Sequence, residues 1–350
     1  MIPASQLKSA SDYIMVVRPL LPREAFEPEP RHVVRIFAHL AIILLGYVVL
    51  RETSLWWVAV LTALIVGHSQ ACLVFLAHDL SHNSILKDVG GKRALELVIW
   101  GLNLIPPALW QRVHNQTHHP ETNTLRDTDR VYRPSESTTA TWLYMRLFHP
   151  NRQTPLHHPF VLFHFVTYVI RHLTAALLPG DAKPSIVTYK PRYTPAMKRR
   201  LLLELAAIAV FQVALFYFLG GSWWRYVLAV PVPLLVASSV AMVYIFTNHF
   251  LNPLCEKADP LIGATSVEVP KFFDWLHDNN SYHTEHHLFP SMNPRFYPMV
   301  SALLREHFPD RYNRPTIGEA WRRIWLHDQF IGDPDTREAP VTSPLAVPAE

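Results

Sequence analysis

Long, uninterrupted runs of apolar residues occur in two pairs along the chain. Val34–Leu50 and Leu55–Ala77 are separated only by RETS, and Leu201–Leu219 and Trp224–Phe246 repeat this pattern around GGSWW. A helix needs about 20 apolar residues to cross the hydrocarbon core of a bilayer, and each run is close to that length. The pattern therefore predicts an all-α integral membrane protein with four transmembrane helices in two hairpins.

Two further apolar stretches are interrupted and are not expected to span the bilayer. Ala94–Trp110 is broken by Pro106 and Pro107, and Pro159–Leu178 contains three ionisable side chains. Proline interrupts a helix, and charged groups are costly in hydrocarbon. We expect both stretches to form re-entrant or interfacial helices.

The composition supports a membrane protein and argues against a nucleic-acid partner. Hydrophobic residues make up 49% of the chain and charged residues 17%, compared with roughly 25% charged residues in a soluble domain. The 32 Lys and Arg residues barely exceed the 28 Asp and Glu residues and form no long basic run, so we expect a lipid bilayer as partner and no nucleic acid. Two cysteines imply no disulfide framework.

The distribution of positive charge orients the predicted spans. Lys and Arg residues follow the second span and precede the third, whereas the two hairpin loops carry almost none. The positive-inside rule then puts both termini in the cytosol. We expect a cytosolic amphipathic segment over residues 1–33, a membrane domain with a cytosolic helical cap over 34–330, and a disordered tail over 331–350.

Histidine is the residue type whose distribution is most informative. Eight of the 20 histidines fall in three short clusters, HDLSH, HNQTHH and YHTEHH, each after an apolar segment on the predicted cytosolic side. Residues four apart share a helix face, so His78 and His82 can bind one metal, as can His114 and His118. Eight imidazoles exceed the needs of one tetrahedral metal, which favours two metals, but imidazole alone does not select iron.

These clusters, with the flanking phrases THHPETN and EHHLFP, resemble the three histidine boxes of the membrane-bound fatty acid desaturase and hydroxylase superfamily. The resemblance extends from about His68 to Pro290. It implies a non-heme di-iron centre that uses O2, an acyl substrate, and an external electron donor such as ferredoxin with its reductase or a cytochrome b5-like protein. It also implies these iron ligands: His78, His82, His114, His118, His119, His283, His286, His287 and, from FTNHF, His249.

Other candidate site residues follow from their positions beside these histidines. A ligating imidazole usually donates its second N–H to a carboxylate or carbonyl, and the nearest candidates in sequence are Asp79, Asn123, Asp127, Asp129 and Glu285. We count Asp79, Glu285 and Asn248 among the catalytic candidates. Trp110 is a candidate wall of an acyl tunnel, and Arg112 a candidate for holding a substrate carboxylate or phosphate, or for docking an acidic electron carrier.

The histidine boxes do not separate the possible reactions. Desaturation of a fatty acyl chain is the leading hypothesis. Oxidative decarboxylation of a free fatty acid to a terminal 1-alkene is the first alternative, and hydroxylation is the second. A metal transporter is the alternative from a different class, although transport sites lie near the bilayer midplane. Two histidines outside the boxes need separate interpretations. His68, inside the second span, is interpreted as a satisfied intramembrane polar group rather than a ligand, with a functional role held in reserve, and His277, near the third box, stays open.

Overall fold

The computed structural model describes residues 1–87, 90–129, 139–148, 163–249 and 252–326. Regular structure within these residues is helical, and β pairing is limited there to two isolated bridges. The prediction of an all-α protein is confirmed. The predicted tail, 331–350, lies outside the described residues.

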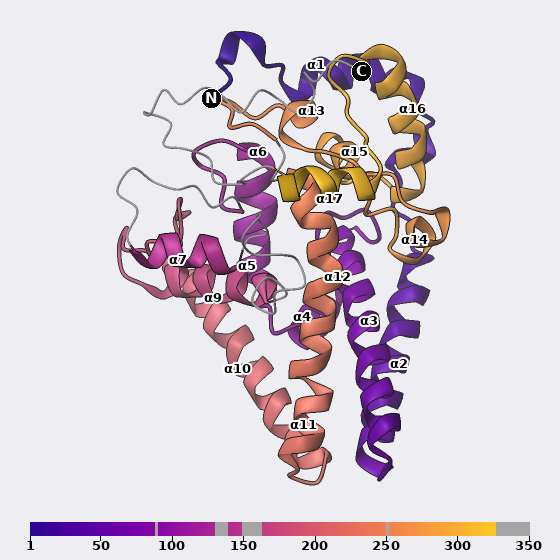
Figure 1. Ribbon diagram of the computed structural model, residues 1–350, viewed down its shortest axis with the longest axis vertical. Coiled ribbons are helices and arrows are strands. Elements are labelled where there is room, and N and C mark those ends of the chain that lie inside the picture. Colours follow the sequence, from indigo (N-terminus) through magenta and orange to yellow (C-terminus); the bar gives the residue numbers. More distant parts are fainter. Residues whose placement is uncertain (88–89, 130–138, 149–162, 250–251, 327–350) are drawn as a thin grey trace.

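Four helices are long and apolar enough to cross a membrane, as predicted. They are α2 (His32–Glu52), α3 (Trp56–Ser81), α10 (Pro195–Phe218), and α11 (Trp223–Ala229) continued by α12 (Pro231–His249). Within the most apolar stretch of each span, the buried share is 61% in α3 and 50% in α11–α12. It is only 28% in α2 and 17% in α10. Consequently α3 and α12 form the inner pair, and α2 and α10 present most of their surface outward (Figure 1).

The inner pair packs with almost no space at one glycine. A Cβ atom added to Gly67 of α3 would lie 2.9 Å from the Cα and carbonyl oxygen of Pro233 in α12. Small residues let membrane helices approach closely, because dispersion contacts replace the hydrophobic effect that drives packing in water. This contact holds α3 and α12 at a fixed distance from each other, and these two helices carry His78 and His249.

Helix α3 is longer than the apolar run that predicts it. Its 26 residues extend to Ser81, which corresponds to about 39 Å against a hydrocarbon core of about 30 Å. The additional turn carries His78, and His82 caps the helix. The first histidine box therefore lies beyond one end of the apolar span.

The second box follows a pair of short helices. Helix α4 (Lys92–Leu102) ends at a break where Leu104 has φ +58°, and α5 (Pro107–Trp110) resumes after it. The interruption predicted from Pro106 and Pro107 is therefore present. The described elements that follow are the π-helix η4 (Gln111–His118), the single turn α6 (His119–Glu121), and two longer helices, α7 (Thr139–Phe148) and α9 (His164–Leu177). Helix α9 covers the described part of the stretch expected over Pro159–Leu178.

The third box lies in a cap that also contains the start of the chain. The cap helices are α1 (Ala10–Val17), α13 (Pro260–Gly263), α14 (Lys271–Leu276), α15 (His283–Leu288), α16 (Tyr297–His307) and α17 (Ile317–Leu326), with 3-10 turns at Ala4–Gln6, Arg18–Leu20, Arg23–Phe26 and Pro294–Phe296. Tyr13 and Val17 share an apolar core with Leu288 and Tyr297. The buried Asp259 carboxylate accepts hydrogen bonds from Tyr13 and Arg311, which ties α1 to the cap.

Candidate metal centre

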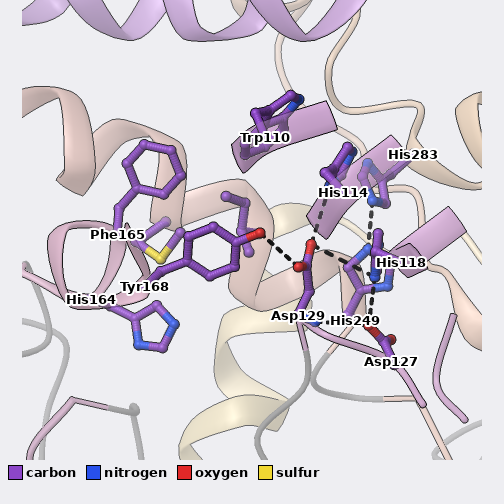
Figure 2. A pocket seen from close by; sticks show the side chains of 12 residues that line it. Trp110, His114, His118, Asp127, Asp129, His164, Phe165, Tyr168, His249 and His283 are labelled. Carbon is purple, nitrogen blue, oxygen red and sulfur yellow. Dashed lines mark hydrogen bonds and ion pairs between the residues drawn. The ribbon is translucent and has the colours of Figure 1, made fainter. Parts of the chain in front are cut away.

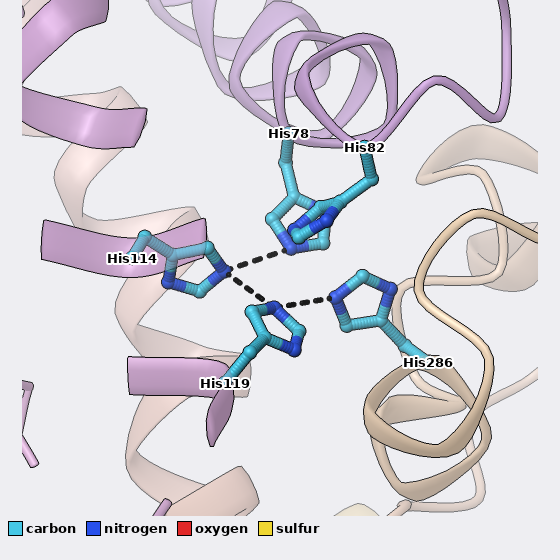
Figure 3. Close-up of side chains that lie close together, drawn as sticks. All are labelled: His78, His82, His114, His119 and His286. Carbon is cyan, nitrogen blue, oxygen red and sulfur yellow. Dashed lines mark hydrogen bonds between the residues drawn. The ribbon is translucent and has the colours of Figure 1, made fainter. Parts of the chain in front are cut away.

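The nine histidines named from the sequence gather at the cap end of α3 and α12 in two adjacent groups. In each group, one ring nitrogen per residue lies within 4.8 Å of those of the others. The four-histidine cluster contains His287 together with His118, His249 and His283, of which the last three are drawn in Figure 2. The five-histidine cluster contains His78, His82, His114, His119 and His286 (Figure 3).

The first and third boxes divide between the clusters as helical geometry requires. His78 and His82 lie one turn apart at the end of α3, and both enter the five-histidine cluster. On α15, His283 and His287 share one face and enter the four-histidine cluster, whereas His286 turns toward the other cluster. One short helix thus serves both groups.

The second box departs from the expected spacing. We predicted that His114 and His118 would bind the same metal as an i, i+4 pair. In the two large clusters they are separated, His114 in the five-histidine and His118 in the four-histidine cluster, although both also form a smaller group with Asp129. The reason is that Gln111–His118 is a π-helix, with the N–H of His119 bonded to the carbonyl of His114. Five-residue periodicity pairs His114 with His119 instead, and their Nε2 atoms lie 3.2 Å apart.

The outward-facing Nδ1 atoms of six histidines have hydrogen-bond partners. Carboxylates accept from three rings: Asp79 from His78 at 3.1 Å, Asp129 from His114 at 3.1 Å and Asp127 from His118 at 2.8 Å. The remaining partners are the Gly263 carbonyl for His249, the Tyr297 hydroxyl for His286 and the Thr122 hydroxyl for His287. Such outer contacts fix the tautomer and orientation of ligating imidazoles.

The inward-facing atoms fit metal ions better than hydrogen bonds. A carboxylate can only accept, so His78 and His114 both carry their proton on Nδ1 and have a lone pair on Nε2. These two Nε2 atoms nevertheless lie 3.1 Å apart. Two facing lone pairs repel each other unless a positive charge lies between them. The residues present therefore fit bound cations.

Burial keeps most of these rings neutral, which is the form that binds metal. Desolvation lowers the pKa well below its usual value for His82, His114, His119, His283, His286 and His287, and neighbouring imidazoles lower it further. His118 differs: burial lowers its pKa, but the Asp127 and Asp129 carboxylates outweigh this and raise it to about 9. The carboxylates of Asp127 and Asp129 therefore stabilise a positive charge at the His118 ring.

A pocket opens beside both clusters. His114, His118, His249 and His283 form one wall together with Asp127 and Asp129. The opposite side is lined mainly by apolar and aromatic side chains from α5, α9 and α12: Trp110, Phe165, Tyr168, Met242 and Ile245, with His164 (Figure 2). Trp110 also stacks on His114, with ring centroids 4.3 Å apart. An apolar ligand in this pocket would lie directly against the histidines.

Residues 54–318 match the family model described as fatty acid desaturase. The chain belongs to the fatty acid desaturase family. It is 23% identical over 290 residues to the fatty acid desaturase of Bacillus subtilis (strain 168), an alignment that covers 78% of this chain and 76% of that protein. It is 24% identical over 327 residues to fatty acid desaturase 3 of Bos taurus, covering 81% of this chain and 70% of that protein. For the fatty acid desaturase 2-like protein FADS2B of Mus musculus, the identity is 23% over 300 residues, covering 80% of this chain and 59% of that protein.

The desaturase family and the four apolar helices make the protein an integral membrane protein. The carboxylates predicted beside the histidines have mixed outcomes. Asp79, Asp127 and Asp129 each contact an imidazole. Glu285 does not: its buried carboxylate accepts hydrogen bonds from Ser266 at 2.5 Å and from Tyr312. Glu285 was wrongly predicted as an imidazole partner, because Ser266 and Tyr312 occupy its carboxylate instead.

The two residues predicted to contact substrate also differ. Trp110 lines the pocket. Arg112 is not among the lining residues, and its guanidinium donates to the carbonyl of Arg192 and to Gln116. The role of Arg112 toward a substrate or an electron carrier stays a prediction.

The two amide residues named from the sequence, Asn123 and Asn248, are both buried. Asn123 is buried and donates to the Gly263 carbonyl, so it positions the loop that contacts His249. Asn248 is 1% exposed, and both polar atoms of its side chain lack a hydrogen-bond partner within the described part of the chain. An unsatisfied buried amide next to His249 suits a role at the metal centre.

Four contacts at the site were not predicted from the sequence. Thr122, Gly263 and Tyr297 accept from ligand-cluster imidazoles, and Tyr168 donates to Asp129 at 2.7 Å. Thr122 lies inside the phrase THHPETN, so its position near the second box was a usable signal. The other three come from segments without a histidine box.

Proposed function

We propose that this protein uses dioxygen and electrons from an external donor to introduce a double bond into a fatty acyl chain in the membrane. Family membership supports an oxidoreductase of this general type, and the printed names of the relatives describe fatty acid desaturases. The observation that carries the proposal is the position of the pocket. Its apolar walls hold a chain, and four histidines from the two clusters form its remaining wall.

Two iron ions would be held in this site, one by the five-histidine cluster and one by the four-histidine cluster. The nine imidazoles named from the sequence would supply the ligands, and the unsatisfied amide of Asn248 directly precedes His249 of the four-histidine cluster. When bound, the irons supply the reduction of dioxygen and an oxidant able to attack an unactivated C–H bond. Iron rather than another metal rests on the family, because imidazole binds several transition metals.

The protein's own residues would prepare this chemistry. Asp79, Asp127 and Asp129 hold three rings in the tautomer that points Nε2 inward. Trp110 keeps His114 in place by stacking and bounds the pocket. The apolar side chains opposite exclude water and hold the acyl chain at one depth, which determines the carbon that reacts.

Product analysis tests the proposal. Membranes containing the protein would be supplied with labelled fatty acyl substrates, dioxygen and a ferredoxin or cytochrome b5-like reducing system. We expect an internal double bond with the carboxyl carbon retained, iron in the purified protein, and loss of product in His286→Ala. His307→Ala changes an exposed cap histidine and is the matched control. Iron-free protein that transports metal would instead support the transporter alternative.

One observation keeps oxidative decarboxylation as a second candidate. Arg171 is 2% exposed and lies one turn beyond Tyr168 on α9, with its guanidinium 5.4 Å from the Tyr168 ring. Among the described residues, its hydrogen bonds go to the carbonyls of Ile186 and Asp129 and no carboxylate lies within ion-pair distance. A buried guanidinium beside the pocket suits the carboxylate of a free fatty acid. If product analysis gave a volatile 1-alkene one carbon shorter than the substrate, we would assign oxidative decarboxylation to the protein instead of desaturation.

We also propose that the cap end faces the cytosol, where an electron donor can reach the clusters. The distribution of Lys and Arg around the spans supports this orientation. Segment 1–33 and α17 lie at the same end of the four spans as α15 (Figure 1). Labelling of a cysteine introduced at Asp310 in sealed, right-side-out cells tests it: an impermeant reagent should fail to react until the membrane is opened.

A further inference from the structure

A third group of metal-binding side chains lies apart from the nine histidines. His68 and Cys72 lie one turn apart on α3, and His277 follows α14 in the cap. One ligand atom of each lies within 4.8 Å of the others. Cys72 precedes His78 by six residues, or about 9 Å of helix rise, so this group is separate from the five-histidine cluster.

The spacing of the atoms fits a shared metal ion better than direct hydrogen bonds. Nε2 of His277 lies 3.4 Å from Nε2 of His68. The Cys72 sulfur lies within 4.8 Å of the ligand nitrogens of both histidines. Good N–H···N contacts are shorter, near the usual 2.9–3.0 Å of protein hydrogen bonds. Two nitrogens that each bind a tetrahedral metal at about 2.1 Å are separated by about 3.4 Å.

The surroundings of His277 resemble those of a ligating histidine. Its Nδ1 atom lies 2.8 Å from the hydroxyl of Tyr244, which is buried on α12. This contact leaves Nε2 directed at His68. A ligating imidazole typically uses its other nitrogen in such a hydrogen bond, which holds the ring in place.

One more imidazole lies near this group without belonging to it, that of His39 on α2. The imidazole of His39 lies within electrostatic range of His277. Its Nδ1 atom is buried and has no hydrogen-bond partner within the described residues. Three or four ligands that include a thiolate are the usual set for a zinc-type ion.

We infer that Cys72, His68 and His277 bind a third metal ion, of the thiophilic zinc class, that joins span α3 to the cap. Thiolate and imidazole together favour zinc or copper over magnesium or calcium. The ion would hold the loop after α14 against α3, two turns below the first histidine box. This inference does not depend on the reaction that the nine-histidine site performs.

Cobalt substitution of the full-length protein tests the site by its thiolate. Co²⁺ bound to a thiolate gives a charge-transfer band in the near ultraviolet, and neither the five-histidine nor the four-histidine cluster contains sulfur. We expect this band in the wild-type protein and its loss in Cys72→Ser. Cys255→Ser, which changes the only other cysteine, is the matched control and should keep the band.

Metal analysis gives a second readout. Cys72→Ser and His277→Gln should each lose about one zinc or copper equivalent per chain while the iron content is unchanged. If Cys72→Ser fails to accumulate in membranes, His277→Gln in the cap provides the same test. A chain of hydrogen bonds from Tyr244 through His277 and His68 to Cys72 is the metal-free alternative. Two results would overturn the inference in favour of this hydrogen-bonded chain. One is the absence of the charge-transfer band in the wild-type protein, and the other is the persistence of the band in Cys72→Ser.

Discussion

The backbone N–H of His119 donates to the carbonyl oxygen of His114, and the Nε2 atoms of the same two residues lie 3.2 Å apart. In an α-helix this N–H would bond to residue 115, and His114 would share its face with His118. The π-turn moves His118 to the neighbouring cluster. The Thr117 hydroxyl donates to the Arg112 carbonyl at 2.8 Å, which satisfies an acceptor that the irregular helix exposes. A rare helix type thus lets one short segment contribute to two sites.

Loss of a carboxylate behind an imidazole should weaken metal binding. Asp127→Asn removes the negative charge behind His118 and permits the wrong tautomer, because an amide can donate as well as accept. We expect iron affinity and activity to fall by about 10- to 100-fold. Iron content after dialysis against a graded chelator measures this. Asp310→Asn, on the exposed cap surface, should retain iron, and equal loss in both variants would contradict the role of Asp127.

Filling the pocket should change the chain length that the enzyme accepts. Met242→Trp puts an indole into the apolar wall opposite the histidines. We expect turnover of the longest accepted acyl chain to fall about tenfold or more, with shorter chains affected less, because each lost methylene contact costs about 1–3 kcal/mol. Product profiles over a chain-length series measure this. Leu202→Trp, on the exposed face of α10, is the control, and an unchanged profile in Met242→Trp would exclude the pocket as the acyl site.

The close approach of α3 and α12 should not tolerate a methyl group. In Gly67→Ala, the new Cβ would lie 2.9 Å from the Pro233 backbone and 2.6 Å from the Val236 Cβ. The helices must separate, and we expect a loss of about 1–3 kcal/mol in the free energy of unfolding. Thermal unfolding in detergent measures the loss. Gly318→Ala meets no atom within 4 Å, so its midpoint should match that of the wild type.

Acid should destabilise the protein partly through His172. This ring is 1% exposed, and burial together with the positive charge of Arg171 lowers its pKa from 6.5 to about 3. The unfolded chain takes up a proton below pH 6.5 and the folded chain does not, so the stability present above pH 6.5 is lost as pH falls toward 3. The loss is about 1.4 kcal/mol per pH unit.

The difference between His172→Asn and wild type isolates this contribution. Unfolding midpoints in detergent should decline less steeply between pH 6.5 and 4 in His172→Asn than in the wild-type protein. His307→Asn, in which the exposed cap histidine is changed, should follow the wild-type curve. Parallel curves for His172→Asn and wild type would show that His172 is not held neutral.

Hydropathy and residue spacing were sufficient to predict the spans and the first histidine box. A run of apolar residues must be helical in lipid, and His78 and His82 extend that helix by one turn, so their direction follows from its period. Local regularity of this kind is visible in a single segment. The break at Pro106 was predictable for the same reason, since proline interrupts a helix wherever it occurs.

The remaining features depend on contacts between distant segments. Nothing in QRVHNQTH distinguishes a π-helix from an α-helix, because the choice follows from where His114 and His118 must reach. Glu285 lies inside a box, yet Ser266 and Tyr312 bind it, and only the folded cap shows this.

The packing of α1 against α15 and α16 has a consequence for biosynthesis. The third box is held by Tyr13 and Val17 from the start of the chain and by Tyr297 and Tyr312 from near its end. The four spans lie between these two segments in the sequence. The apolar core that holds the third box can therefore form only after all four spans and the segment with Tyr312 have been synthesised. A metal ion that needs the completed third box would therefore bind after translation, and a chain without α1 would insert its spans while this side of the histidine clusters stays uncovered.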